Sequence, residues 1–163
     1  METRFRQIRF NLNGKDVECV IDVRMSLLDL LRETFGLVSV KKGCEVGECG
    51  ACTVLINGEA FDSCIYLAAW ADGKEILTLE GLTGPDGSLS DIQQAFVDET
   101  AVQCGFCTPG FILSAWEILS TGKEYTDDEL RKLLSGHLCR CTGYENILRA
   151  VRKVMKERAQ TKQ

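Results

Sequence analysis

Eight of the nine cysteines in this 163-residue chain fall into two separate sets of four. The first set follows a C-x4-C-x2-C spacing with a fourth cysteine after eleven further residues, and it comprises Cys44, Cys49, Cys52 and Cys64. The second set joins a C-x2-C pair to a C-x-C pair across thirty-one residues, and it comprises Cys104, Cys107, Cys139 and Cys141. Four thiolates are a complete ligand set for one metal centre. The chain must therefore bring each set together, which predicts two metal sites.

The two cysteine sets lie in different halves of the chain, and its length suits either one average domain or two small ones. The densest run of turn residues, 84–87, lies between the sets. We therefore expect two domains, over residues 1–82 and 88–163. Domains of this size bury little surface and often depend on a metal for stability.

The charge and hydropathy patterns exclude several classes of partner. The formal net charge is −5, with acidic and basic residues interspersed, so we expect no nucleic-acid partner. The longest strictly apolar run, residues 64–71, is far shorter than the roughly 20 residues that span a bilayer, so we expect no membrane span. The first residues lack the pattern of an export signal, which indicates a cytoplasmic protein with reduced thiols.

The first half of the chain has the signals of a small sheet with one short helix. Alternation around an Asn13-Gly14 pair predicts a hairpin over residues 5–21. Ser26 is a predicted N-cap of a helix that stops before Gly36. Further strands are expected over 53–56, before an Asn57-Gly58 turn, and over 74–79. This half is predicted to be α+β.

In the second half the apolar period changes from two to about 3.6 residues, which predicts a small helical bundle. The expected helices cover 89–99, 109–121, 127–135 and 143–158. The predicted N-caps are Thr108, Thr126 and Thr142, the last two in capping boxes with Glu129 and Glu145, and the predicted C-caps are Gly122 and Gly136.

The first cysteine set has the spacing of plant-type 2Fe-2S ferredoxins. Three thiols and three glycines share residues 43–52, so the backbone must turn tightly and can aim N–H groups at sulfur. A structural zinc site is the alternative, but such sites favour paired C-x2-C knuckles. The second set, taken alone, suits zinc and iron equally well.

The remaining reactive side chains predict no bond chemistry by this chain alone. A Rieske centre needs two histidines, and the chain has one, His137, which is expected to be solvated after a helix end. Cys19, in the second strand, is expected to be a small buried hydrophobe. No phosphate-binding glycine loop and no nucleophile with an adjacent base is present, so no catalytic residue is expected.

Three motifs occur in order: GCEVGECGACTV over 43–54, QCGFCTPG over 103–110 and LCRCTGY over 138–144. Together they resemble the iron-sulfur subunit of the xanthine oxidase family of molybdenum hydroxylases, and the resemblance covers essentially the whole chain. It implies an N-terminal β-grasp ferredoxin-like domain and a C-terminal four-helix bundle, each with one 2Fe-2S cluster. The second site is thereby expected to hold iron.

The resemblance also implies partners and an order of electron transfer. The second cluster is expected beside a molybdopterin, in its plain or cytosine dinucleotide form, on a large catalytic subunit. The first is expected nearer to FAD on a third subunit, in a heterotrimer or a dimer of heterotrimers. By the same comparison Gln103 and Cys141 are expected to contact the pterin, with Cys141 also ligating iron.

Within the family the chain looks most like bacterial xanthine or purine dehydrogenases, which carry this subunit as a separate chain. Aldehyde, carbon monoxide and N-heterocycle hydroxylases have similar small subunits and are the alternatives. The rival classes of function are a zinc-stabilised interaction module and a free-standing ferredoxin.

Overall fold

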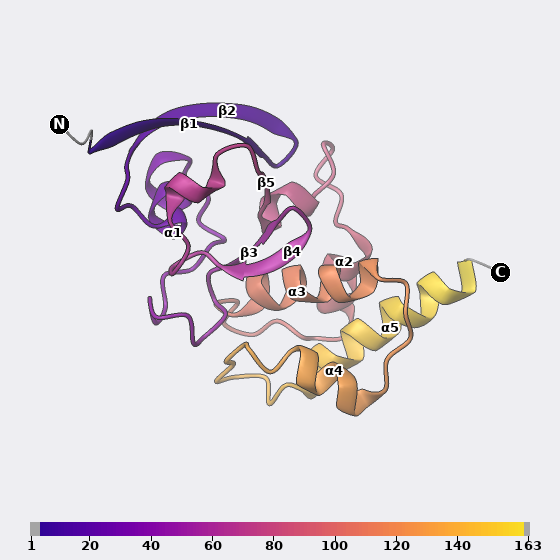
Figure 1. Ribbon diagram of the computed structural model, residues 1–163. Coiled ribbons are helices and arrows are strands. Elements are labelled where there is room, and N and C mark those ends of the chain that lie inside the picture. Colours follow the sequence, from indigo (N-terminus) through magenta and orange to yellow (C-terminus); the bar gives the residue numbers. More distant parts are fainter. Residues whose placement is uncertain (1–3, 162–163) are drawn as a thin grey trace.

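The computed structural model describes residues 4–161 and contains a mixed five-stranded sheet beside a group of helices (Figure 1). The strands are β1 (Phe5–Leu12), β2 (Lys15–Asp22), β3 (Thr53–Ile56), β4 (Glu59–Asp62) and β5 (Glu75–Leu77), in the order β2-β1-β5-β3-β4. The α-helices are α1 (Leu27–Asp29), α2 (Asp91–Asp98), α3 (Thr108–Ser120), α4 (Asp127–Leu133) and α5 (Glu145–Thr161). None of the described helices is long and apolar enough to cross a membrane.

Both predicted hairpins are confirmed, and the Asn-Gly pairs form their turns. β1 and β2 pair antiparallel from Phe5 opposite Asp22 to Leu12 opposite Lys15, and β3 pairs with β4 in the same way. Asn13 and Gly14 have φ angles of 52° and 81°. Two successive positive φ angles match the right-handed twist of the flanking strands, which explains why this dipeptide sets the register.

The predicted short helix begins where expected, but it changes its hydrogen-bond pattern after one turn. The Ser26 hydroxyl accepts a bond from the Asp29 amide at 3.0 Å, which confirms the N-cap. The segment η1 (Leu30–Thr34) then continues as a π-helix, and Gly36 has a φ of 68° beyond its end. The predicted strand over 74–79 is shorter in the structure because a 3-10 turn, η3 (Leu79–Leu82), replaces its last residues.

Two of the predicted helix ends in the second half are confirmed. The Thr126 hydroxyl accepts from the Glu129 amide, and the Glu129 carboxylate accepts from the Thr126 amide at 2.7 Å, as a capping box requires. Gly122 follows the C-cap of α3 with a φ of 66°, the left-handed conformation that glycine adopts without strain.

Three other predicted ends are wrong. Thr108 is the first residue of α3, and Cys107 occupies the cap position before it. Gly136 lies past the C-cap Leu134 of α4 and is not among the residues with a positive φ. The predicted capping box at Thr142 is absent, because the Thr142 hydroxyl has other partners near the second cysteine set.

Strand β3 is buried on both faces and forms the wall between two hydrophobic clusters. Its residues Val54 and Ile56 pack in a cluster with α1 and the sheet, whereas Leu55 packs in the other cluster with α2, α3 and α5. Alternate residues of a strand point to opposite faces, so one strand serves both clusters. Helix α3 consequently lies against β3 and β4, with α4 and α5 farther from the sheet (Figure 1). The α+β fold class, a ferredoxin-like sheet part followed by a four-helix part, is confirmed.

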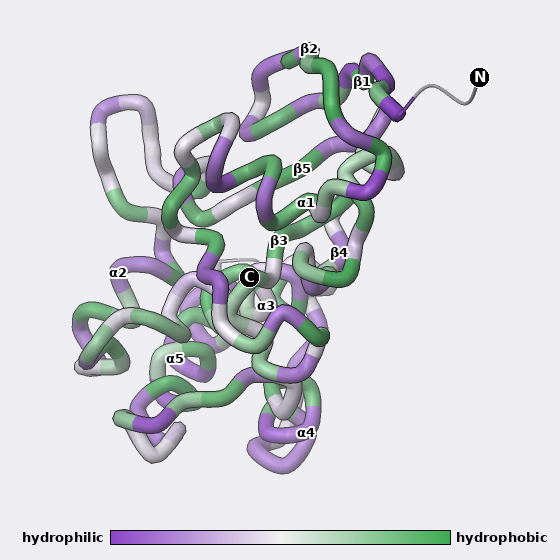
Figure 2. The backbone as a smooth tube through the Cα atoms, turned by 90° about the vertical axis from the view of Figure 1, so that its left-hand side faces the viewer, coloured by the Kyte–Doolittle hydropathy of each residue, from purple (hydrophilic) through white to green (hydrophobic). Residues whose placement is uncertain are grey.

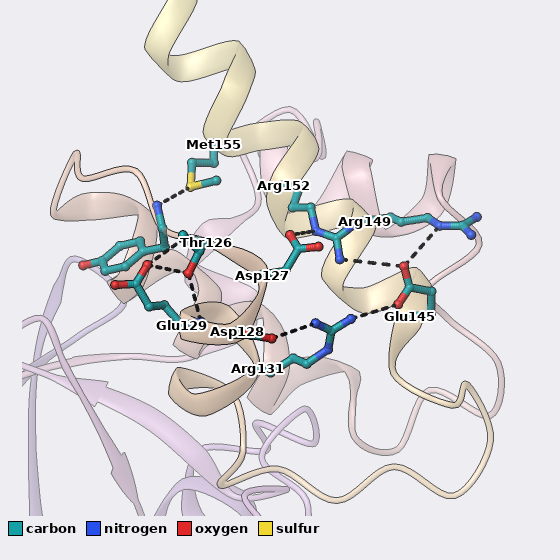
Figure 3. Close-up of polar contacts among 10 residues, drawn as sticks. Thr126, Asp127, Asp128, Glu129, Arg131, Glu145, Arg149, Arg152 and Met155 are labelled. Atoms are coloured by element: carbon teal, nitrogen blue, oxygen red, sulfur yellow. Dashed lines mark hydrogen bonds and ion pairs between the residues drawn. The ribbon is translucent and has the colours of Figure 1, made fainter.

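The polar helix α4 packs on the helical cluster through one buried side chain, Leu130, and forms ion pairs with α5 at the surface. Its trace is mostly hydrophilic in Figure 2, and only Leu130 of the helix is buried. Arg152 of α5 lies 2.6 Å from Asp127, and Glu145 pairs with Arg131 at 3.6 Å (Figure 3). These partly exposed pairs each contribute little, but together they set the place of α4 and of the loop that follows it.

A hydrogen-bonded carboxylate, Glu80, joins the segment after the sheet to the loop before the first cysteine set. It accepts from the Ser39 hydroxyl at 2.5 Å, the Ser39 amide at 3.1 Å and the Thr78 hydroxyl at 2.6 Å. Partial desolvation raises the pKa of Glu80, but these bonds outweigh it and leave the pKa lowered.

We predict that Glu80→Ala lowers the free energy of unfolding by about 1 to 2 kcal/mol at pH 7, because two buried hydroxyls lose their acceptor. A lowered folded-state pKa means that the contribution is present above the unfolded pKa of about 4.5 and is lost as the pH falls through the folded value. Urea unfolding should therefore show a difference that shrinks below about pH 4.5. The exposed Glu59→Ala is the control, and an equal loss there would contradict the assignment.

Candidate functional site: two loops of paired cysteines

Three members of the first cysteine set, Cys44, Cys49 and Cys52, lie in a tight loop between η1 and β3, and the fourth, Cys64, follows β4. Glu45, Gly47 and Gly50 have φ angles of 60°, 77° and 67°, so the chain turns repeatedly and aims its amides inward. The N–H groups of Val46 and Glu48 reach the Cys44 sulfur at 3.5 and 3.4 Å.

These backbone bonds, with a smaller contribution from the facing Cys49, lower the pKa of the Cys44 thiol to about 7. The Cys44 thiol consequently ionises more readily near neutral pH than an ordinary thiol.

The other two members of this set form a second, more buried pair. Burial raises the pKa of the Cys52 thiol to about 12, and the adjacent Cys64 thiol and Asp62 carboxylate add to the rise. The Ser63 hydroxyl donates to the Cys52 carbonyl at 2.7 Å and so fixes the chain directly before Cys64. Binding of a metal at this pair must release protons, because only thiolates are ligands.

The second cysteine set joins the start of α3 to the loop between α4 and α5. Burial raises the pKa of Cys107 to about 12, and its neighbouring thiol is Cys139. The side chain of Cys104 contacts Cys141 and raises the pKa of that thiol. Cys104 and Cys141 are exposed, whereas Cys107 is buried, so one pair of this set faces outward.

Both sets therefore consist of two facing pairs: Cys44 with Cys49, Cys52 with Cys64, Cys107 with Cys139 and Cys104 with Cys141. A 2Fe-2S cluster takes four thiolates, two on each of its irons. Among residues 4–161 no three His, Cys, Asp or Glu side chains converge closely enough to hold a single metal ion. Four thiolates arranged as two pairs fit the ligand set of a two-iron cluster.

Two side chains around Cys139 were not predicted to have any part in the site. The Thr142 hydroxyl lies 3.0 Å from the Cys139 sulfur, and it also accepts from the Tyr144 amide at 3.2 Å. Burial raises the pKa of Cys139, but the Thr142 bonds outweigh this and lower it. The Tyr144 hydroxyl accepts from the Cys139 amide at 3.0 Å. In the sequence, the only signal for a role of Thr142 and Tyr144 is that both lie in the LCRCTGY motif.

The prediction for His137 is wrong: the side chain is buried, with 7% of its surface exposed. It stacks at a tilt on Phe111, with ring centroids 4.8 Å apart. Burial lowers the pKa of His137 below its usual value. The residue is thus a neutral interior group between the two halves.

The other predicted residues differ in exposure. Gln103 is exposed directly before Cys104. Cys19, expected to be buried, is only half-buried, and it packs at the edge of the sheet-side cluster. It lies in β2, whereas the first cysteine set lies in the loops on either side of β3 and β4.

The two cysteine loops come into contact at two glycines, Gly50 and Gly110. A Cβ added at Gly110, in the first turn of α3, would lie 2.2 Å from the Gly50 carbonyl oxygen, and one added at Gly50 would lie 2.1 Å from the His137 ring. Beside them the Leu138 amide donates to the Cys49 carbonyl at 3.1 Å. Glycine is required at both positions for this approach.

We predict that Gly110→Ala destabilises the protein by about 1 to 3 kcal/mol, because the new methyl group overpacks the contact with Gly50. In an uncrowded helix the same substitution would raise stability by roughly 0.5 to 1 kcal/mol, so the sign of the change in unfolding free energy shows whether the contact is crowded. Gly136→Ala is the matched control, since nothing lies within 4 Å of its added Cβ. A gain of stability in Gly110→Ala, measured by denaturant unfolding, would contradict the close approach of the loops.

Two family models match the chain. The model of the 2Fe-2S iron-sulfur cluster binding domain matches residues 10–78, and that of the 2Fe-2S binding domain matches residues 78–152. The first contains Cys44, Cys49, Cys52 and Cys64, and the second contains Cys104, Cys107, Cys139 and Cys141. Each cysteine set thus falls within one iron-sulfur domain.

Relatives that span nearly the same length are small subunits of dehydrogenases. The chain is 52% identical over 145 residues to the nicotinate dehydrogenase small FeS subunit of Eubacterium barkeri, covering 89% of this chain and 92% of that protein. It is 53% identical over 146 residues to the xanthine dehydrogenase iron-sulfur-binding subunit of Escherichia coli O157:H7, covering 88% and 91%.

Solved structures show the same fold. Quinoline 2-oxidoreductase from Pseudomonas putida 86 superposes with a TM-score of 0.91 at 42% identity and covers 98% of both chains. The aldehyde oxidoreductase of Desulfovibrio gigas superposes at 0.89 with 36% identity, over 97% of this chain but 18% of that one. In that enzyme a matching segment is part of a much longer polypeptide.

Proposed function

Because this chain belongs to the iron-sulfur subunits of the molybdenum hydroxylase family, we propose that its paired cysteines hold two 2Fe-2S clusters that carry electrons between partner subunits. The observation that carries the proposal is the division of each set into two facing pairs, which matches the two irons of such a cluster. The proposed ligands are Cys44, Cys49, Cys52 and Cys64 for the first cluster and Cys104, Cys107, Cys139 and Cys141 for the second.

The chain's own contribution is to hold and polarise these sulfurs. Donors to a thiolate reduce the negative charge on sulfur and help to set the potential of a cluster. The amides of Val46 and Glu48 act in this way at Cys44, and the Thr142 hydroxyl acts so at Cys139. A bound cluster would supply the one-electron chemistry, and we propose no catalysis by this chain alone.

We propose that the second cluster faces the molybdopterin of a large catalytic subunit. Support comes from the exposure of Cys104 and Cys141 beside exposed apolar side chains, Phe106 at 46% and Leu138 at 61%. Apolar groups gathered at a surface suit a protein partner. Gln103 and Cys141 would contact the pterin, in its plain or cytosine dinucleotide form, with the Gln103 amide as the hydrogen-bonding group.

We propose that the first cluster passes electrons to FAD on another subunit. Its loop also presents apolar side chains to solvent, since Val46 and Ile65 are 64% and 62% exposed. These lie beside Cys44 and Cys64 in sequence, so a partner that covers them would come close to the cluster. Electrons would then run from molybdenum through the second cluster and the first to the flavin.

The proposed assembly is a heterotrimer or a dimer of heterotrimers in the cytoplasm. All nine cysteines are free of disulfides, as reduced metal ligands must be. Electron flow between separate cofactor subunits distinguishes this role from that of a free-standing ferredoxin. Such a chain should purify together with molybdopterin and flavin subunits.

For the complex we propose hydroxylation of an aromatic N-heterocycle, with xanthine or another purine as the first candidate. The relatives named for xanthine and nicotinate are almost equally similar to this chain, so a pyridine carboxylate is the second candidate. Relatives named for aldehyde oxidoreductases are 42% identical. The purified complex assayed with xanthine, nicotinate and an aldehyde should turn over a heterocycle fastest, and preference for the aldehyde would refute this choice.

We predict that Cys104→Ala removes one cluster, and therefore half of the iron and acid-labile sulfide and one of two EPR signals of the reduced protein. The helical half should also lose stability, because cluster binding is coupled to folding in small metal domains. Cys19→Ala, outside both sets, is the matched control and should keep both clusters. A colourless, EPR-silent wild type that binds only zinc would contradict the proposed function.

We predict that Gln103→Ala leaves both clusters intact but slows electron flow from molybdenum to the second cluster in the purified complex. Iron content and the two EPR signals should equal those of the wild type, while the rate of cluster reduction by substrate falls. Gln94→Ala, on the exposed face of α2, should change neither. Loss of iron in the Gln103 variant would show a structural role instead.

A further inference from the structure

The single histidine lies at the contact between the two cysteine loops. His137 is two residues before Cys139, and its ring reaches across to Gly50, which stands between Cys49 and Cys52. The ring is buried, so each of its nitrogens needs a hydrogen-bond partner. Both nitrogens have one.

The partners determine which nitrogen carries the proton. Nδ1 lies 3.2 Å from the Gly50 carbonyl oxygen, which can only accept, so Nδ1 is the protonated nitrogen. Nε2 then has a free lone pair and accepts from the Ser114 hydroxyl, 2.7 Å away on α3. The neutral imidazole thus bridges two elements: its Nδ1–H donates to the Gly50 carbonyl of the first loop, and its Nε2 accepts from Ser114 of α3.

The bridge is embedded in a rigid setting. The Gly50 carbonyl also accepts from the Thr53 hydroxyl at 2.8 Å, and Gly110 packs directly against it. Next to the histidine, the Leu138 amide bonds to the Cys49 carbonyl. A shift of the ring would therefore move the first loop relative to the second.

We propose that His137 is a positioning residue for electron transfer between the two cysteine sets, because its Nδ1–H bond to Gly50 fixes the separation of the two loops. The proposal rests on the proposed function, in which both sets hold 2Fe-2S clusters. Clusters held by the two cysteine sets would supply the one-electron chemistry, so that the electron lost at the second set would be gained at the first. No bond forms or breaks, and the histidine keeps its proton.

Transfer through protein slows steeply as the separation of donor and acceptor grows, so a loosened contact has a kinetic effect. It also has a magnetic effect, because the coupling between two reduced clusters depends on their distance and orientation. Both can be measured on a chain whose clusters are intact. These two measurements distinguish a positioning role of His137 from a purely stabilising role.

The test compares two amide substitutions of His137, one that keeps the hydrogen bond to Gly50 and one that keeps the hydrogen bond to Ser114. The Asn amide can replace Nδ1 and donate to Gly50, whereas the longer Gln amide reaches the position of Nε2 and Ser114. His137→Asn should therefore rescue what His137→Gln loses. Ser114→Ala removes only the second bond and is the further control.

The full chain is reduced with dithionite, and iron, sulfide and both EPR signals are measured first. The magnetic splitting between the signals and the rate of inter-cluster transfer after pulse radiolysis follow. We expect all three variants to keep wild-type iron. His137→Gln should lose the splitting and slow the transfer several-fold, while His137→Asn and Ser114→Ala keep both.

Wild-type splitting and rate in His137→Gln would overturn the proposal. Equal losses of splitting and rate in all three variants would also overturn it, because they would indicate a general packing effect. Loss of iron in His137→Gln would overturn it too, because it would indicate a role in cluster assembly. A wild-type chain without two cluster signals would overturn the proposed function and this inference with it.

Discussion

The close approach of the Gly50 backbone to α3 is the contact on which the rest of the arrangement depends. Without side chains at Gly50 and Gly110, the loop of the first cysteine set can lie directly against the helix that begins at the second. The buried ring of His137 donates to the Gly50 carbonyl at this place, and the Thr53 hydroxyl is a second donor to the same oxygen. Two small cysteine-rich units are thereby held as neighbours.

The sheet and the helices support that contact from both sides. β3 begins directly after the first cysteine loop and is buried on both faces, so the loop is anchored in two hydrophobic clusters at once. On the other side, the ion pairs between α4 and α5 set the ends of the loop that carries Cys139 and Cys141 (Figure 3). Core packing positions one cysteine loop, and surface charge helps to position the other.

Local signals in the sequence were sufficient for much of the fold, because they act over a few residues. The Asn13-Gly14 turn and the Thr126 capping box are stabilised by their own backbone, and both are as predicted. The capping box predicted at Thr142 is absent, because the Thr142 hydroxyl bonds to the Cys139 sulfur and the Tyr144 amide at the second site. The burial of His137 depends on residues far away in the chain, which no local pattern records.

The cysteine spacings predicted two metal sites, and the structure adds the pairing within each set, which favours a two-iron cluster. Mössbauer spectroscopy of the chain enriched in iron-57 tests this most directly. We expect all iron in the oxidised protein to be in diamagnetic ferric pairs, and each pair at both sites to take up one electron under dithionite. Iron at only one set of cysteines, with zinc or mononuclear iron at the other, would contradict it.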